Sequence, residues 1–300
     1  MPHPPILDLE NCASALADAT DRARAGRPLD DLADSGIQLE AVHRLNQLVP
    51  GATTTLNQIP TALAQHGLLL LRNVPAADDT LLILLGAVAA PATTCEANGP
   101  RLVDHLSPAV SGEERHRAQN QRSEMLLHTD ASAQQAPPDI VGLACVANEG
   151  NGGGSVLVAV DDIVKRMCQD GQKRTIGLLQ NDFPYIHPQR TERPATLAPV
   201  LRDLGDGHFH VRYRKENLET GKALCPDALT EDTWAAAKLF ARYLEADSRP
   251  QTTLRLQRGD YLLFDNRRYL HGRAAIDPAA YRLLKRTYFT HPTKVQEPVR

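Results

Sequence analysis

The sequence predicts an α+β protein with a predominantly β core, and three features of the 300-residue chain support this fold class. Residues 1–66 are rich in alanine, leucine and polar residues at helical spacing. From residue 101 onward, short apolar runs alternate with Gly, Pro, Asn and Asp clusters, which is typical of β-structure. No repeat, low-complexity tract or linker divides the chain. We therefore expect one domain over 1–300, with a mainly helical part at 1–66 and a β core at about 67–292.

The N-terminal part predicts helices because apolar residues recur there every three or four positions. The expected helices span 11–25, 56–66 and 78–89. Gly67 is a natural end for the second of these, since glycine readily takes the left-handed C-cap conformation. Farther along, Thr230 is a candidate N-cap for a helix whose first turn carries Glu231 and Asp232, where negative charge favours the helix dipole.

The β core is predicted from short apolar runs bounded by turn residues. The expected strands span 67–75, 140–146, 155–160, 208–214, 252–256, 261–264 and 284–289. Arg258-Gly259-Asp260 indicates a tight turn between two of them. The polar, proline-containing stretch 171–207 interrupts this region and is interpreted either as a lid inserted over the mouth of a barrel or as an ordinary surface excursion.

Composition excludes several classes of protein. The formal net charge is −3 and the arginines are scattered, which gives no electrostatic case for nucleic acid or an anionic membrane as a partner. No run reaches the ~18 apolar residues that a membrane-spanning helix requires. The N-terminal residues Met1 to Pro5 lack the basic and apolar regions of a secretion signal. The sequence thus favours a cytoplasmic protein, and nothing in it specifies an oligomeric state.

The cysteines point to the same compartment. They are odd in number, widely spaced and without a Cys-x-x-Cys pair, so neither a disulfide framework nor a structural zinc site is expected. The five are Cys12, Cys95, Cys145, Cys168 and Cys225. We interpret them as reduced thiols.

The most informative pattern is His128-Thr129-Asp130, followed 141 positions after Asp130 by His271. Residues i and i+2 of an extended segment point to the same side, so His128 and Asp130 could face one metal ion. Two histidines and one carboxylate on one face are the ligands of non-haem Fe(II), and they leave half of its coordination sphere open. His271 would have to lie on a strand that returns antiparallel beside the first, as barrels and jelly rolls allow. The alternative is a loop-capping His128 and an ordinary half-buried His271.

Further elements accompany this pattern in a fixed order. They are the glycine-rich Gly152-Gly153-Gly154-Ser155, the segments Phe264-Asp265-Asn266 and His271-Gly272-Arg273, and Arg282 and Arg286 at eleven and fifteen residues beyond His271. Taken jointly, over about residues 60–290, they resemble the taurine dioxygenase and clavaminate synthase group of Fe(II)/2-oxoglutarate-dependent oxygenases. The resemblance implies a double-stranded β-helix, or jelly roll, that holds iron at its open end.

The resemblance also assigns roles to residues. It implies that His128, Asp130 and His271 bind Fe(II), which leaves three positions for a bidentate 2-oxoglutarate and O2. Related halogenases replace the carboxylate with a small residue, so the presence of Asp130 favours a hydroxylase. Arg282 matches the arginine that binds the distal carboxylate of 2-oxoglutarate. Ser155 corresponds to the family's hydroxyl on the same carboxylate, with serine in place of the commoner threonine.

Arg286 lies four residues after Arg282, which on a strand places both on one face about 13 Å apart. It is expected either in the cofactor pocket or facing the substrate. In the family, the second arginine tends to hold an acidic group of the substrate. The alternative is a salt bridge at the rim.

The expected reaction is oxidation, most simply hydroxylation, of an unactivated C–H bond of a small amino acid-like or acidic metabolite in secondary metabolism, with release of succinate and CO2. The substrate is either free or attached to a carrier. Gln121, Arg122 and Glu124, in the loop before His128, and the stretch 171–207 are expected to contact it. Two alternatives are kept: a non-catalytic metal-binding jelly-roll protein and an iron oxygenase that does not use 2-oxoglutarate.

Several other polar groups are interpreted as structural. The three glycines at 152–154 form a turn into the Ser155 strand, because no Gly-Lys-Ser/Thr follows them. Asp265 and Asn266 shape the turn before His271 through side-chain hydrogen bonds to the backbone. Arg212 and Arg214 are interpreted as a solvated face, and Asp161-Asp162 as the start of a helix. The remaining candidate histidines are not assigned as ligands: His187, His208 and His210.

Overall fold

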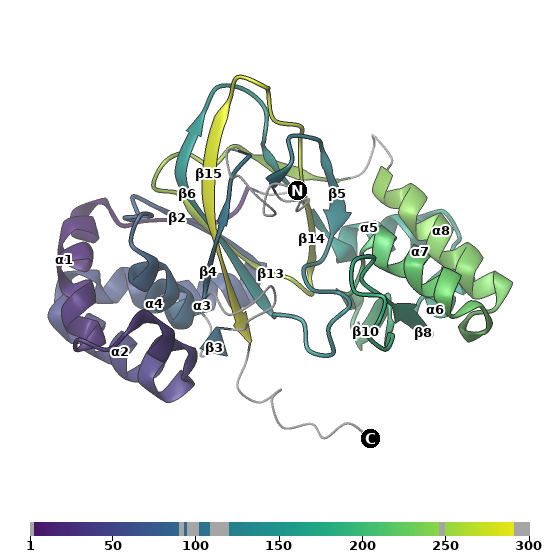
Figure 1. The fold of residues 1–300 in the computed structure, drawn as a ribbon, viewed down its shortest axis with the longest axis horizontal. Helices are drawn as coiled ribbons and strands as arrows, with labels where there is room; N and C mark the ends of the chain where they lie inside the picture. Colours follow the sequence, from purple (N-terminus) through teal and green to yellow (C-terminus); the bar gives the residue numbers. More distant parts are fainter. Residues whose placement is uncertain (1–2, 90–92, 95–101, 109–119, 246–249, 291–300) are drawn as a thin grey trace.

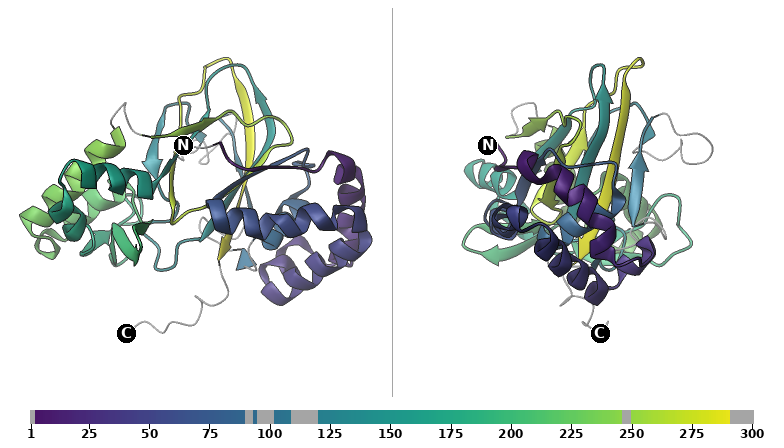
Figure 2. Two further views of the ribbon diagram at one scale, coloured as in Figure 1. Left: turned by 180° about the vertical axis from the view of Figure 1, so that it is seen from behind. Right: turned by 90° about the vertical axis from the view of Figure 1, so that its left-hand side faces the viewer.

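The computed structural model describes residues 3–89, 93–94, 102–108, 120–245 and 250–290. Two β-sheets occupy the centre, with the N-terminal helices on one side and a second group of helices on the other (Figure 1). The views from behind and from the side show the same layering (Figure 2). In the part of the chain so described, no helix combines the length and apolar character needed to cross a membrane.

The larger sheet has seven strands. In spatial order they are β1 (Ile6–Asp8), β2 (Leu68–Arg72), β13 (Tyr261–Asp265), β6 (Ile140–Glu149), β15 (Tyr281–Thr290) and β3 (Thr93–Thr94), with β4 (Val103–Leu106) also paired to β15. All of these pairs are antiparallel except β1 with β2. The ten-residue strand β15 thereby joins β6 to the two short edge strands.

The smaller sheet has four strands and carries the C-terminal histidine motif. Its order is β12 (Thr252–Leu254), β7 (Ser155–Ala159), β14 (Tyr269–Arg273) and β5 (Met125–His128), all antiparallel. Two hairpins lie apart from it: β8 (Asp182–Tyr185) with β9 (Thr196–Pro199), and β10 (Leu201–Gly205) with β11 (His208–Val211).

Helices cover the outer face of each sheet. The N-terminal group comprises α1 (Ala13–Arg24), α2 (Ser35–Leu48), α3 (Thr53–His66) and α4 (Asp79–Ala89). The second group comprises α5 (Val160–Gln169), α6 (Lys173–Leu178), α7 (Lys215–Leu224) and α8 (Glu231–Glu245). The two groups appear at opposite ends of the molecule in Figure 1.

Alternation along the strands explains how one chain fills three core clusters. In β2, Leu69 and Leu71 pack with the N-terminal helices, while Leu68 and Leu70 face the space between the sheets. Side chains of a strand point alternately to its two faces, so a continuous apolar run fits a sheet covered on both sides. On the smaller sheet, Val158 and Leu270 pack with the second group of helices. The inner faces of the two sheets are thus free to carry the polar groups at one end of the space between them.

Much of the predicted secondary structure is confirmed. Helices occur at all of the expected places, and strands at all seven. Gly67 ends α3 with a φ of 66°. The Thr230 hydroxyl accepts a hydrogen bond from the Thr233 backbone N–H at 3.1 Å, as expected of an N-cap. The predicted turn before β13 is also present, with Gly259 at a φ of 87°.

Three expectations need correction or lie outside the description. Beyond residue 101 the chain is not all β, because α6 and α7 accompany the expected α8 and the helix expected at Asp161-Asp162, which is α5. In the N-terminal part, α2 was not anticipated. The stretch 171–207 is built from α6 and hairpin strands rather than irregular chain. Residues 1–2 and Cys95 lie outside the described residues. Among the described residues, four cysteines are free thiols: Cys12, Cys145, Cys168 and Cys225.

Candidate metal centre and the adjoining pocket

Three side chains, His128, Asp130 and His271, meet at the edge of the smaller sheet. One candidate ligand atom from each lies within 4.8 Å of the other two. His128 Nε2 is 3.5 Å from Asp130 Oδ1, and His271 Nε2 is 3.7 Å from Asp130 Oδ2. A divalent metal ion bound by two imidazoles and a carboxylate fits a cluster of this size and chemistry.

Strand pairing brings the two histidines together. β14 runs antiparallel to β5, and His271 is the register partner of His128, so the predicted return of the distal strand is confirmed. The histidine ring centroids are 4.4 Å apart. Gly272 permits this approach, because a Cβ at that position would lie 2.6 Å from the Met125 carbonyl oxygen. Steric crowding against β5 therefore explains why glycine follows His271.

The charge states of the cluster suit metal binding. His128 Nδ1 lies 2.8 Å from the Leu126 carbonyl oxygen, which orients the ring with Nε2 toward Asp130. Burial, together with the neighbouring His271, lowers the pKa of His128 to about 4, so the imidazole is neutral at pH 7. Burial alone would raise the pKa of Asp130, but Arg286 and the two histidines hold it well below its usual range. His271 Nδ1 is buried and has no hydrogen-bond partner within the described part of the chain.

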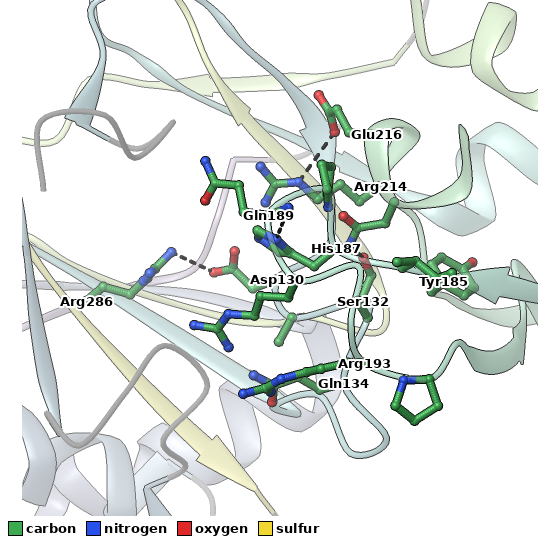
Figure 3. Close-up of a pocket in the computed structure, with 17 residues that line it drawn as sticks. Asp130, Ser132, Gln134, Tyr185, His187, Gln189, Arg193, Arg214, Glu216 and Arg286 are labelled. Atoms are coloured by element: carbon green, nitrogen blue, oxygen red, sulfur yellow. Dashed lines mark hydrogen bonds and ion pairs between the residues drawn. The ribbon is translucent and has the colours of Figure 1, made fainter. Parts of the chain in front are cut away.

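Asp130 is held from the facing sheet by two residues of β15. Tyr288 donates its hydroxyl hydrogen to Asp130 Oδ2 at 2.9 Å. Arg286 Nη1 lies 3.3 Å from the same oxygen (Figure 3). Arg286 also donates to Asp104 on β4 at 3.0 Å, and its guanidinium lies over the Tyr288 ring. Because two carboxylates face it, Arg286 is a buried ion-pair partner and not a cation at the rim.

The backbone around Asp130 is fixed by a side chain 136 positions away. Asn266 Oδ1 accepts a hydrogen bond from the Asp130 N–H at 2.8 Å. Its Nδ2 donates to the carbonyl oxygens of Asp130 and Pro138 at 3.2 and 2.9 Å. Asp265 makes the predicted local bond, accepting from the Arg267 N–H at 2.9 Å. The structural interpretation of this pair is confirmed, although Asn266 acts at long range and not within its own turn.

Replacing Asn266 with alanine is expected to lower the free energy of unfolding by about 2–3 kcal/mol, because three buried backbone groups would lose their partner. Chemical denaturation monitored by circular dichroism measures this change. Asn181→Ala, at an exposed turn, is the matched control and should change stability by less than about 0.5 kcal/mol. Equal stability of the two variants would show that the Asn266 bonds do not hold the loop.

A second cationic group lies on the same inner face of β15. Arg282 is buried and no carboxylate pairs with it among the described residues. Burial and the neighbouring Arg273 lower the pKa of Arg282 to about 10. Arg273 is buried on β14 opposite Ser155 of β7, and it donates to the carbonyl oxygens of Gln121 and Ser123. A desolvated guanidinium without an acid is a ready partner for a bound anion.

The glycine-rich segment forms a turn into β7, as predicted. Gly152 and Gly153 have φ values of 79° and 68°, and Gly153 donates to the Ala275 carbonyl oxygen at 2.9 Å. A Cβ on Gly153 would lie 3.1 Å from Arg282 Cδ. The turn thus delivers Ser155 to its strand and leaves room for the Arg282 side chain.

A pocket of about 320 Å³ opens beside Asp130. Its far wall comes from the loop between β8 and β9 and from the residues after β11, which supply His187, Arg193 and Arg214 (Figure 3). Arg212 and Arg214 are half-buried rather than solvated: Arg212 donates to the Gln134 carbonyl oxygen at 3.1 Å, and Arg214 lines this pocket. The interpretation of the pair as a solvated face was wrong.

The three residues expected to contact substrate are placed differently from one another. Gln121 and Glu124 line a smaller pocket of about 240 Å³ next to His128. Arg122 instead donates to the carbonyl oxygens of Asp277 and Ala280 at 2.7 and 3.1 Å. Arg122 therefore anchors the loop before β15, whereas the other two face open space near the cluster.

Known proteins of similar sequence carry related descriptions. A gamma-butyrobetaine dioxygenase of Pseudomonas sp. (strain AK-1) is 26% identical over 228 residues, which is 75% of this chain and 57% of that protein. A uridine-5'-phosphate dioxygenase of Streptomyces sp. is 28% identical over 158 residues, 51% of this chain and 56% of that protein. The matched regions thus span little more than half the length of these relatives.

Solved structures share the fold. An asparagine oxygenase in complex with Fe(II), 3-hydroxyasparagine and succinate superposes with a TM-score of 0.73 at 19% identity, covering 96% of this chain and 95% of that one. The non-haem iron oxygenase OrfP in complex with Fe and alpha-ketoglutaric acid gives a TM-score of 0.68 at 19% identity, with 97% and 96% covered. At this identity the likeness establishes a common fold.

The family is established by a match along most of the sequence. The model of the taurine catabolism dioxygenase TauD, TfdA family matches residues 28–288. That span includes the histidine and carboxylate cluster and both buried arginines of β15. The chain therefore belongs to the taurine catabolism dioxygenase TauD, TfdA family, as its motifs predicted.

Proposed function

We propose that this protein is an Fe(II)- and 2-oxoglutarate-dependent dioxygenase that hydroxylates an unactivated C–H bond of a small amino acid-like or acidic metabolite. The observation that carries the proposal is the pairing of two features across the space between the sheets. One is the cluster of His128, Asp130 and His271, and the other is the buried Arg282, which has no acidic partner among the residues that the structure describes. A metal cluster on the smaller sheet and an anion site on the facing strand β15 match a cosubstrate with a chelating end and a distal carboxylate.

The donor set fits Fe(II). Two neutral imidazole nitrogens and one carboxylate are the facial ligands that non-haem iron oxygenases use, with the other positions open. When bound, iron together with 2-oxoglutarate and O2 supplies the oxidising power that removes hydrogen from the substrate and releases succinate and CO2. Tyr288 and Arg286 keep the Asp130 carboxylate ionised and fixed in orientation, and the Leu126 carbonyl oxygen keeps His128 Nε2 available.

Residues on both sheets fit 2-oxoglutarate. The fork of Arg282 would bind its distal carboxylate, and the buried Ser155 hydroxyl would donate to the same group. We propose that the two central sheets form the double-stranded β-helix expected of this family, within a single domain. In such a barrel the apolar side chains below the cluster, among them Phe264 and Leu157, exclude water from the reacting atoms.

The substrate class is proposed from the pocket and from the relatives. The solved relatives carry 3-hydroxyasparagine or other amino acids, and the curated ones are named for gamma-butyrobetaine and uridine-5'-phosphate. A small polar metabolite with an acidic group is common to these names and suits a pocket lined by arginines. We also propose that 171–207 acts as the lid over this pocket, because the loop between β8 and β9 forms its far wall.

The test is anaerobic addition of Fe(II) and then 2-oxoglutarate to the purified apoprotein. Chelation of iron by the 2-oxo acid is expected to produce a weak visible charge-transfer band without any substrate. Iron binding without the band would favour the two alternatives, a metal-binding jelly-roll protein or an oxygenase that does not use 2-oxoglutarate. Consumption of O2 in the absence of 2-oxoglutarate would then select the second of these.

A further inference from the structure

The pocket beside Asp130 ends in a group of basic side chains that the proposed chemistry at iron does not use. We name Arg190, Arg193 and Arg214 the arginine cluster; all three line this pocket. Two consecutive backbone turns place the first two: Arg190 N–H donates to the His187 carbonyl oxygen at 2.9 Å, and Arg193 N–H donates to that of Arg190 at 3.1 Å. The third follows β11 and faces the same space (Figure 3).

The charges of the cluster are not balanced by the protein. Arg214 lies 3.4 Å from Glu216, and within the described residues no carboxylate forms an ion pair with Arg190 or Arg193. Three guanidinium charges against one carboxylate leave an excess of two positive charges. His187 adds none at neutral pH, because burial and the three arginines lower its pKa. The excess favours a ligand with about two negative charges.

A buried polar atom in the same pocket also lacks a partner. Asn217 is 2% exposed and donates from Nδ2 to the Ser132 hydroxyl at 2.9 Å, while its Oδ1 accepts no hydrogen bond from any described residue. Buried acceptors without donors are rare in folded proteins. Asn217 lines the pocket near Asp130. Because Oδ1 is closed to solvent, a ligand amine or hydroxyl would satisfy it only after the Asn217 side chain turns toward the pocket.

We propose that the substrate is a phosphomonoester whose phosphate binds to Arg190, Arg193 and Arg214, with an amine or hydroxyl on Asn217 and its carbon skeleton toward Asp130. The inference rests on the proposed function and names its substrate class. A carboxylate carries one charge and occupies one guanidinium fork, whereas a phosphomonoester carries about −1.5 to −2 and three acceptor oxygens. The pocket volume of 320 Å³ lies in the range of roughly 300–1,000 Å³ found for small-molecule sites.

The experiment titrates O-phospho-L-serine, L-serine and L-aspartate into the protein by calorimetry at fixed ionic strength. We expect O-phospho-L-serine to bind at least about tenfold more tightly than the other two, and the double variant Arg190→Gln/Arg193→Gln to weaken it by about tenfold per guanidinium removed. The matched control is Arg258→Gln, an exposed arginine on the turn before β13, which should bind like the wild type. Both replaced arginines are exposed, so the variant should fold normally.

Several outcomes would overturn the proposal. Equal binding of phosphoserine and serine would show that the pocket does not recognise a phosphate. Tighter binding of aspartate would indicate a dicarboxylate substrate instead. Loss of phosphoserine binding in Arg282→Met, with retention in the double variant, would place the probe in the cosubstrate site. The double variant should still form the charge-transfer band with Fe(II) and 2-oxoglutarate. Absence of that band in the wild type would instead contradict the proposed function, so the two failures are separate.

Discussion

Replacing His271 with alanine is expected to abolish iron-dependent turnover of 2-oxoglutarate while leaving the fold intact. The variant removes one of three proposed ligands, so iron affinity should fall by more than the roughly 10- to 100-fold that loss of an outer hydrogen-bond partner costs a metal site. The fold should survive because His271 Nδ1 makes no hydrogen bond and the ring lies at the end of the core. Succinate release and iron titration measure the two effects.

A matched control comes from a histidine outside the cluster. His208 contacts Asp161 at 2.8 Å on the outer hairpin, and His208→Ala should retain both iron binding and succinate release. Circular dichroism of the two variants should resemble that of the wild type. If His271→Ala released succinate at the wild-type rate, whether coupled to substrate or not, the ligand assignment would be wrong.

Replacing Arg282 with methionine is expected to weaken 2-oxoglutarate binding by roughly 100-fold, since truncating one member of a buried charge pair costs about 2–5 kcal/mol. Iron binding itself should be unchanged, because Arg282 does not contact the three-residue cluster in the described structure. Titration of 2-oxoglutarate into the Fe(II)-loaded protein, followed by the charge-transfer band, gives the affinity directly.

The same variant should raise the free energy of unfolding of the apoprotein, although it weakens 2-oxoglutarate binding. Without an anion, the wild type keeps a desolvated guanidinium beside the equally buried Arg273. Methionine has a similar reach and no charge, so the apoprotein should gain about 1 kcal/mol in unfolding free energy. Arg202→Met, on exposed β10, should change neither property. A destabilised apo variant would mean that Arg282 has a structural role and not a role in binding an anion.

The parts of the site that depend on short-range pattern were predictable from the sequence. His128 and Asp130 are two residues apart, and the apolar run that ends at His128 indicates a strand, so their common face follows from strand geometry. The antiparallel strand that carries His271 was predicted because a third ligand must lie beside the first two. The order of the motifs then predicted the family correctly, because joint spacing is much more specific than any one motif.

Other parts depend on tertiary contacts that no local pattern reveals. Asn266 resembles a turn residue, but its amide bridges to Asp130 across 136 positions. Arg214 ends the segment 208–214, whose alternation suggested a strand with a solvated face, but it lies beyond β11 and lines a pocket together with the β8–β9 loop. Helix α5 was recognisable by its acidic start, whereas α7 begins at Lys215 with no side-chain N-cap bond. Tertiary packing, and not local sequence propensity, determines these features.

The division of the site between two sheets has a consequence for the lifetime of the protein. The proposed iron ligands belong to the smaller sheet and to the loop after it, while Arg282 and Arg286 belong to the larger one. A cosubstrate bound to both would connect the two sheets across the space between them. At a hundredfold excess over its Kd, such a ligand adds about 2.7 kcal/mol to the stability of the folded state. Protein without bound 2-oxoglutarate would therefore unfold and be degraded more readily than the bound form. The amount of enzyme would then follow the supply of its cosubstrate.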